Sequence, residues 1–436
     1  MSLDKFRKYI CLIIVIAISG SIIFFSNSIK MHILGMIVLC VGSMLIVKLD
    51  FAHPYVWYSG IFTLYSISYP ILYLAGYHNK YGYTNELMII QWIALVTFLI
   101  VVSPLDKIKL NTNSINIKNK NGRIVINVII VMILIGSVII KSAGYSGKND
   151  IYLSNNTFLN LVFLLSTLLI VMYTFELVNY INKCDSIDVK LIFKVCLSLA
   201  ILVMFSGERD IIFRTLVVTV MILYILGKLK NKHVMLMLPV GMLMLPLSHI
   251  YKYFFLTGNI SGNMSFKLKD LLLSFLDGEF VSASRNMQIL LNNESFTKGF
   301  LEGKGILNDF ARIFLRTDFS NGMWFHNTFF TNSRTGYGFT MVGEGYINFG
   351  YMGVILVFTI IGLFIRYLYK NAARNIYYLT AYIYAIPLYM YAVRADLANI
   401  FSQFVKHLLL SLVLVCILKK IPGIVIKKSN NNQVHN

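Results

Sequence analysis

Charged residues cluster in three short segments at the ends of apolar stretches. Residues 207–210 read Gly-Glu-Arg-Asp with Arg214 just beyond them, residues 343–353 open an apolar stretch and include Glu344, and residues 394–396 read Arg-Ala-Asp. A guanidinium offers a planar fork of donors to phosphate oxygens, and a poorly solvated carboxyl group can take up a proton near neutral pH. Such guanidiniums suit a pyrophosphate, and such a carboxyl group suits acid–base chemistry.

Two of the three segments also allow a purely structural interpretation. Asp210 and Arg214 are four residues apart, so an ion pair on one helix face could hide the Arg214 charge from lipid. No acidic residue stands three or four positions from Arg209, and a functional role and an ordinary topological charge stand as equal alternatives for it. Arg394 and Asp396 could be the solvated charges of an exposed turn.

The segment 343–353 is expected to form the first turns of a membrane helix. At helical spacing one face carries three polar side chains, those of Glu344, Asn348 and Tyr351. A smooth neighbouring stripe consists of three glycines, Gly343, Gly350 and Gly353. Close helix packing explains the glycines. Glu344 is then either the partner of an arginine or a catalytic group that poor solvation keeps ready to accept a proton.

The elements that position these residues are predicted to be membrane helices. Of 436 residues 57% are hydrophobic and 13% are charged, and the mean hydropathy is +0.70. One soluble core could not hide so much apolar surface, and in lipid the backbone must form helices or closed barrels. The apolar stretches lack the alternation of barrel strands, so the expected fold class is all-α. Twelve spans are expected, near 9–25, 31–49, 55–75, 86–103, 123–141, 157–178, 190–206, 211–229, 234–254, 341–365, 376–393 and 398–418.

Lysine and arginine set the expected orientation, because they resist translocation while acidic residues contribute little. With a cytoplasmic N-terminus every even-numbered connection is basic, so both termini are expected in the cytoplasm and all three charged segments outside it. The chain then divides into a nine-helix membrane region 1–254, a large extracytoplasmic loop 255–340, a three-helix membrane region 341–418 and a basic polar tail 419–436. Inner loops facing anionic headgroups explain the net charge of +20, and no nucleic-acid partner is expected.

Residues 207–210, the stretch 343–350 with Gly353, and residues 394–396 together resemble the Wzy-type repeat-unit polymerases of O-antigen and capsule synthesis. The expected helix count and the place of the outer loop agree with that family across nearly the whole chain. The resemblance implies a glycosyltransferase at the outer face of the bacterial inner membrane, where a glycan leaves undecaprenyl pyrophosphate and joins the next lipid-linked repeat unit. The implied partners are the lipid-linked donor and acceptor, the bilayer, a chain-length regulator and a flippase.

The resemblance also suggests roles for individual residues. Arg209 and Arg394 would hold the pyrophosphate with Arg214 behind them, and Glu344 is the first choice of base ahead of His326. Supporting residues would be Glu208, Asp210, Asn348, Tyr346 and Asp396. Further arginines stand in reserve at Arg312, Arg316 and Arg334.

Two neighbouring classes of membrane protein are alternatives. His326 followed by Asn327 is also similar to O-antigen ligases, but the ligase pair stands closer to its glycines, which favours the polymerase. A lipid-linked oligosaccharide flippase would show two similar halves and a site at the midplane, which this sequence lacks. A non-catalytic assembly partner would not need buried arginines on two separate turns.

No metal or other cofactor is expected. Asp277 and Glu279 are separated by one residue, as in carboxylate pairs of metal-dependent transferases, but arginines can neutralise the leaving group without a cation. The five cysteines fall in expected helices or an inner loop, and no pair has zinc-ligand spacing.

The orientation generates the first prediction. A reporter enzyme fused after Asn293 should be active only outside the cytoplasm, and one fused after Asn119 only inside it, because basic residues flank the second position. Activity measured in whole cells for both fusions checks this. The reverse pattern would rule out the orientation and the side assigned to the charged segments.

Overall fold

The computed structural model describes residues 3–108, 122–144, 156–237, 275–315, 319–330 and 338–411, with residues 273, 413, 414 and 417. Within these residues the regular structure is helical and no strand occurs. The longer elements are α1 (Leu3–Phe24), α2 (Ile29–Ile46), α3 (Pro54–Leu74), α4 (Asn85–Val102), α5 (Gly122–Ser142), α7 (Thr157–Cys184), α8 (Val189–Ser206), α9 (Asp210–Ile225), α16 (Met341–Asn371) and α17 (Ile376–Ala392). The shorter ones are η1 (Asn79–Tyr81), η3 (Leu276–Phe280), α12 (Val281–Asn292), α13 (Glu294–Thr297), α14 (Lys304–Ala311), α15 (Asn321–Phe329), α18 (Ala398–Gln403) and η4 (Phe404–Leu409).

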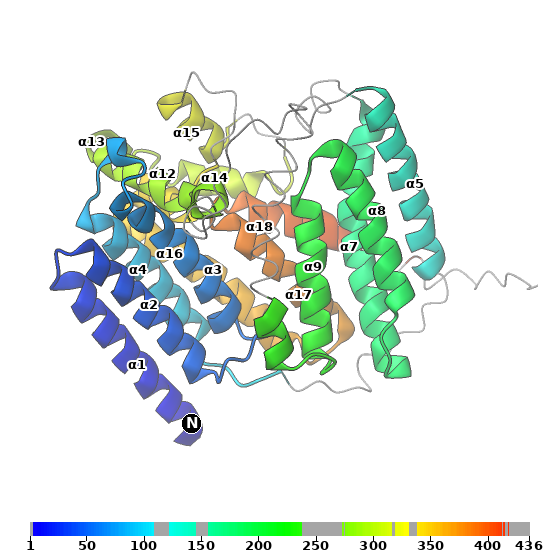
Figure 1. The fold of residues 1–436 in the computed structure, drawn as a ribbon, viewed down its shortest axis with the longest axis horizontal. Coiled ribbons are helices and arrows are strands. Elements are labelled where there is room, and N and C mark those ends of the chain that lie inside the picture. The colour runs from blue at the N-terminus through cyan, green and yellow to red at the C-terminus, as the bar shows by residue number, and fades with distance from the viewer. Residues whose placement is uncertain are drawn as a thin grey trace, which may run out of the picture.

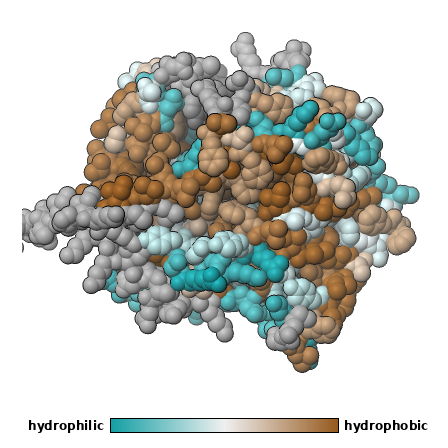
Figure 2. All heavy atoms as spheres, turned by 180° about the vertical axis from the view of Figure 1, so that it is seen from behind, coloured by the Kyte–Doolittle hydropathy of each residue, from teal (hydrophilic) through white to brown (hydrophobic). Residues whose placement is uncertain are grey.

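The protein is an all-α polytopic membrane protein. Seven of the described helices are long and apolar enough to cross a membrane, namely α1, α2, α4, α5, α7, α8 and α16. Large hydrophobic side chains are exposed on the helices α1, α2 and α5, for example Ile13, Leu45 and Val138. Lipid rather than water is a favourable environment for them. Figure 2 shows a broad hydrophobic band across one face of the molecule, with hydrophilic side chains gathered above and below it.

The expected spans coincide with helices wherever the structure describes them. Spans 55–75, 211–229 and 376–393 correspond to α3, α9 and α17, while the last span begins as α18 and η4. Span 234–254 lies largely outside the described residues, as does the tail 419–436. The count of twelve spans and the orientation stay predictions.

Residues 255–340, which we call the outer segment after the side predicted for them, contain the helices α12 to α15 in their described part. Helices α12 to α15 lie at the end of the molecule opposite the N-terminus (Figure 1). Helix α12 contacts α3, α4 and α16, and α14 contacts α16 and α18, so the segment packs on the membrane helices over much of its length. Elements far apart in sequence are thereby brought to one end of the bundle.

The loop between α8 and α9 has a fixed turn geometry. Gly207 ends α8 with φ of 71°, a left-handed conformation that favours glycine over any residue with a Cβ. The hydroxyl of Ser206 accepts a hydrogen bond from the Glu208 amide at 3.3 Å, and α9 then begins at Asp210. This turn places Arg209 immediately before α9, where it is half-buried.

Helix α16 is broken near its start, which corrects the expectation of one continuous helix face over residues 343–353. Phe349 (φ −146°, ψ 25°) and Gly350 (φ 60°, ψ −140°) are not helical. Amides of the outer segment replace the lost helical donors, since Gly299 donates to the Tyr346 carbonyl at 3.0 Å and Leu301 to the Ile347 carbonyl at 2.9 Å. Glu344 and Asn348 therefore share a short helical segment, while Tyr351 lies beyond the break.

Two glycines of α16 touch backbone to backbone across this break. A Cβ built on Gly353 would lie 1.9 Å from the Gly345 carbonyl oxygen, and one on Gly345 would lie 2.6 Å from the backbone of Val354. In a straight helix residues eight apart would be separated by about 12 Å, so the two parts of α16 fold sharply against each other. Gly345 and Gly353 are therefore required by this contact between the two parts of α16 rather than by packing of α16 against another helix.

The second prediction tests this contact. Gly353→Ala should destabilise the protein by about 3 kcal/mol or more, because the added methyl meets backbone that cannot rotate away. Gly322→Ala is the control, since its methyl would meet nothing closer than the Phe339 side chain at 3.9 Å. Thermal unfolding of the two purified variants in detergent makes the comparison. Equal stability of both variants would show that the sharp fold at residues 345–353 is absent.

Candidate active site

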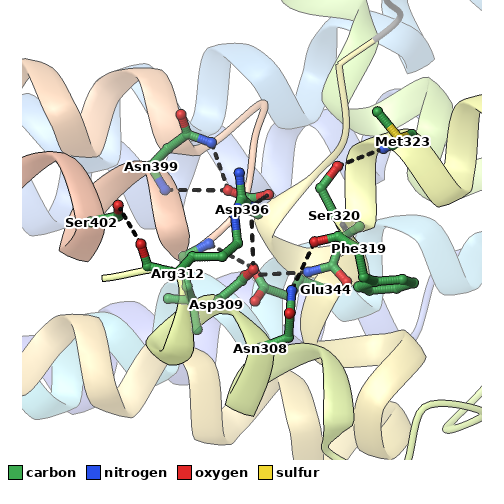
Figure 3. A network of polar contacts seen from close by, with 12 residues as sticks. Asn308, Asp309, Arg312, Phe319, Ser320, Met323, Glu344, Asp396, Asn399 and Ser402 are labelled. Carbon is green, nitrogen blue, oxygen red and sulfur yellow. Dashed lines mark hydrogen bonds and ion pairs between the residues drawn. The ribbon is translucent and has the colours of Figure 1, made fainter. Parts of the chain in front are cut away.

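Three carboxyl groups from separate elements meet at the end of the bundle that carries α12 to α15. Asp309 comes from α14, Glu344 from the first turn of α16, and Asp396 from the turn before α18, and they are 1%, 0% and 5% exposed. Figure 3 shows their side chains pointing toward one another, with Arg312 alongside. We refer to these four residues as the acidic cluster.

Asp309 and Glu344 are expected to share a proton. Their side chains lie within hydrogen-bonding reach of each other, and two carboxyl groups can form such a bond only if one of them is protonated. Glu344 Oε2 accepts from the Leu397 amide at 2.8 Å, which leaves Oε1 for the pair. Burying an ionised carboxylate costs several kcal/mol, more than a neutral hydrogen bond returns, so the pair favours the shared proton. Burial raises the pKa of Asp309 to about 6.

Arg312 offsets part of the remaining negative charge. Its Nη1 lies 3.3 Å from Asp396 Oδ2 and 3.5 Å from Asp309 Oδ1. Its carbonyl oxygen accepts hydrogen bonds from Ser402 at 3.1 Å and from Lys406 at 2.9 Å, which fixes the end of α14 against α18 and η4. The Arg312 side chain is 31% exposed, so the cluster reaches the surface of the protein on this side.

Asn348 connects α16 to α14. Its Oδ1 accepts hydrogen bonds from the amides of Gly305 at 3.0 Å and Ile306 at 3.3 Å, in the first turn of α14. Its Nδ2 donates to the Glu344 carbonyl at 2.8 Å. The amide thus satisfies donors that the start of a helix leaves open, and it sets the position of α14, which carries Asp309. Tyr346 is fully buried beside these residues, with its ring centre 6.2 Å from that of Tyr351.

The arginines of the first and third segments meet at one aromatic ring. The Arg214 guanidinium lies 5.6 Å from the centre of the Tyr391 ring, and that of Arg394 lies 5.0 Å from the same centre. Arg214 is 4% exposed and pairs with Asp210 at 2.5 Å, which confirms the predicted ion pair. The structure therefore brings Arg214 and Arg394 together, although they are far apart in sequence.

The remaining predicted residues lie in various places. Glu208 and Arg209 are half-buried in the connection before α9, and His326 is half-buried in the last turn of α15. The residues of the acidic cluster come from α14, α16 and the turn at 393–397. Beside the cluster lies Asn321 of α15, whose Nδ2 donates to Asp309 Oδ2 at 3.3 Å. Arg316, Arg334 and the Glu279 side chain lie outside the described residues.

Sequence reasoning missed Asp309 and named Arg312 only as a reserve. The sequence does place Asp309 and Arg312 three residues apart on a short helix of the outer segment. Such a pair of opposite charges is common on any solvated helix, so it did not point to a functional site. Asp277 is half-exposed, and a hydrogen bond with His78 lowers the pKa of its carboxyl group. In the part of the chain that the structure describes, no group of three or more His, Cys, Asp or Glu side chains is arranged to hold a metal ion.

Comparison with protein-family models, with curated proteins and with solved structures gives no match for this chain. A functional proposal therefore rests on the geometry of the site and on the resemblance of its short motifs.

The shared proton generates the third prediction. The pKa of Asp309 is about 6 in the folded protein against an ordinary 3.8, so its stabilising contribution is complete below 3.8 and is lost as the pH rises through 6. The loss should be on the order of 3 kcal/mol. Asp309→Asn should remove this dependence, because an amide cannot lose the proton.

The measurement is the unfolding midpoint in detergent between about pH 4 and about pH 8 for the wild-type protein and Asp309→Asn. The difference between the two isolates Asp309 from the other titrating groups. Parallel curves would show that Asp309 does not hold an additional proton in the folded protein.

Proposed function

We propose that this protein polymerises lipid-pyrophosphate-linked oligosaccharide repeat units at the outer face of the bacterial inner membrane. The observation that carries the proposal is the meeting, at one end of the bundle, of a buried carboxyl cluster with two arginines that share the Tyr391 ring. Glycosyl transfer from a lipid pyrophosphate needs both chemistries, a proton acceptor and a fixed cationic site.

In the proposed reaction a hydroxyl of the acceptor sugar attacks the anomeric carbon of the donor glycan. The bond between that carbon and the pyrophosphate oxygen breaks, and the bonding electrons leave with the undecaprenyl pyrophosphate. The hydroxyl proton passes to the acidic cluster, with Glu344 as the base. Because Glu344 is fully enclosed, the acceptor approaches on the side of Arg312, and the proton enters through the Asp396 and Asp309 carboxyl groups.

The arginines have separate parts in this proposal. Arg394 and Arg209 are both half-buried, and each offers a fork to the pyrophosphate oxygens as negative charge develops on them. Arg214 is 4% exposed, pairs with Asp210 and donates to Gln403 at 2.6 Å, and because it is so enclosed it supports the site rather than gripping the substrate. Donors fixed before the reaction stabilise the developing charge without reorganising, which is why their positions matter.

A deletion strain tests the function itself. Loss of a polymerase should leave single lipid-linked repeat units on the outer face of the inner membrane, together with lipid A or capsule carrier that bears one unit at most. Loss of a flippase would leave the same units on the inner face. Normal polymer in the deletion strain would overturn the proposal.

The fourth prediction concerns the pyrophosphate site. Arg209→Lys and Arg394→Lys should each lower polymer yield roughly tenfold or more, because an ammonium keeps the charge but loses the bidentate fork. Glu344→Gln should abolish polymer, since an amide cannot accept the proton. Polymer length and amount are measured on gels at matched protein levels.

Arg374→Lys is the matched control, because Arg374 is an exposed arginine in the connection between α16 and α17. It should leave polymer unchanged. Normal polymer from Arg209→Lys or Arg394→Lys would make that arginine a packing or topological charge, and normal polymer from Glu344→Gln would remove Glu344 from the mechanism.

A further inference from the structure

A chain of side-chain hydrogen bonds connects the buried arginine to the acidic cluster. Arg214 Nη1 donates to Gln403 Oε1 at 2.6 Å, Gln403 Nε2 donates to Asn399 Oδ1 at 3.0 Å, and Asn399 Nδ2 donates to Asp396 Oδ1 at 2.6 Å. Asp396 in turn lies 3.3 Å from Arg312 in the acidic cluster. We call the two amides, Asn399 and Gln403, the amide ladder.

The amide ladder follows one face of a single helix. Asp396, Asn399 and Gln403 are spaced three and four residues apart, so their side chains stack along α18 and the turn before it. Arg214 approaches the far end of the ladder from α9, an element 189 residues from Gln403 in sequence. The ladder therefore fixes the distance between two halves of the site that the chain itself does not connect.

The ladder has one polarity throughout. Each amide accepts on its oxygen from the Arg214 side and donates from its nitrogen toward Asp396. A cation at the donor end and a carboxylate at the acceptor end make both terminal bonds charge-assisted and favour the same orientation of both amides. Apolar residues would fill these partly buried positions near the membrane more cheaply than amides that need partners.

We propose that Asn399 and Gln403 are positioning residues that hold the Arg214 guanidinium and the Asp396 carboxylate in one fixed arrangement, so that the cationic and acidic halves of the site act as a unit. The role in catalysis rests on the function proposed above. The positional coupling itself depends only on the hydrogen-bond chain and can be measured without a substrate.

Three substitutions separate the ladder from simple anchoring of Arg214. Gln403→Met keeps the length of the side chain and removes both of its hydrogen bonds. Asn399→Leu breaks the middle of the ladder and leaves the Arg214 contact intact. Gln403→Glu still accepts from Arg214, but a carboxylate has no donor for Asn399, so only the link toward Asp396 is lost.

Gln91→Met is the matched control. Gln91 is 2% exposed in α4 and accepts one side-chain hydrogen bond, from Ser66 at 3.1 Å, so it is a hydrogen-bonded glutamine of the bundle, more buried than the half-buried Gln403, that does not belong to the ladder. Any loss common to both methionine variants is the cost of removing an amide from the bundle.

Polymerisation by purified protein in bilayer discs, with lipid-linked repeat units as substrate, gives the catalytic test. All three ladder variants should lower kcat by about tenfold or more with KM changed by less than about threefold, while Gln91→Met stays near the wild type. Wild-type activity in Gln403→Glu would overturn the proposal, because it would show that holding Arg214 is sufficient.

A double-mutant cycle on unfolding gives the test that needs no substrate. Asp396→Asn and Gln403→Met are combined, and the unfolding equilibrium constants are measured in detergent. If the ladder couples the two positions, the effect of the double variant should differ from the product of the single effects by about threefold or more. Independent effects would overturn the coupling whatever the protein's substrate is, whereas coupling in a protein that forms no polymer would overturn the proposed function alone.

Discussion

The close approach of the Asp309 and Glu344 carboxyl groups is the contact around which the end of the molecule that carries α12 to α15 is organised. It joins α14, which belongs to the outer segment, to the first turn of α16, and Glu344 also accepts from the Leu397 amide of the turn before α18. Three elements thus depend on one buried acid. Enclosing three carboxyl groups is tolerable when Asp309 and Glu344 hold one proton between them, as we predict, and Arg312 offsets charge from 3.3 Å away from Asp396.

The break in α16 is what makes that contact geometrically possible. A straight helix would carry residues 341–348 away from α14, whereas the fold at Phe349 and Gly350 turns this segment back onto its own helix, with Gly345 and Gly353 in contact. The carbonyl groups exposed by the break accept from Gly299 and Leu301, so the outer segment is needed to complete the helix. Membrane helices and outer segment therefore form one structural unit at this end.

The sequence was sufficient for the features that depend on composition and short-range spacing. It predicted an all-α membrane protein, a helix at each described span, although α7 and α16 end at Cys184 and Asn371 rather than near 178 and 365, and the Asp210–Arg214 ion pair. It could not show the break in α16, because glycine occurs both at positions with positive φ and at close helix contacts, and the residue type alone does not distinguish the two. Asp309 was missed because its partner Glu344 is 35 residues away, and only the tertiary fold brings the two together.

Asp309 and Glu344 are expected to hold one proton between them in the folded protein, and infrared spectroscopy of the carboxyl groups can detect that proton. At about pH 6 the wild-type protein should show the carbonyl stretch of a buried, protonated carboxyl group. Asp309→Asn and Glu344→Gln should each abolish that band, because the introduced amide donates to the remaining carboxyl group and allows it to ionise. A wild-type spectrum without the band, or a band that survives in both variants, would contradict the account.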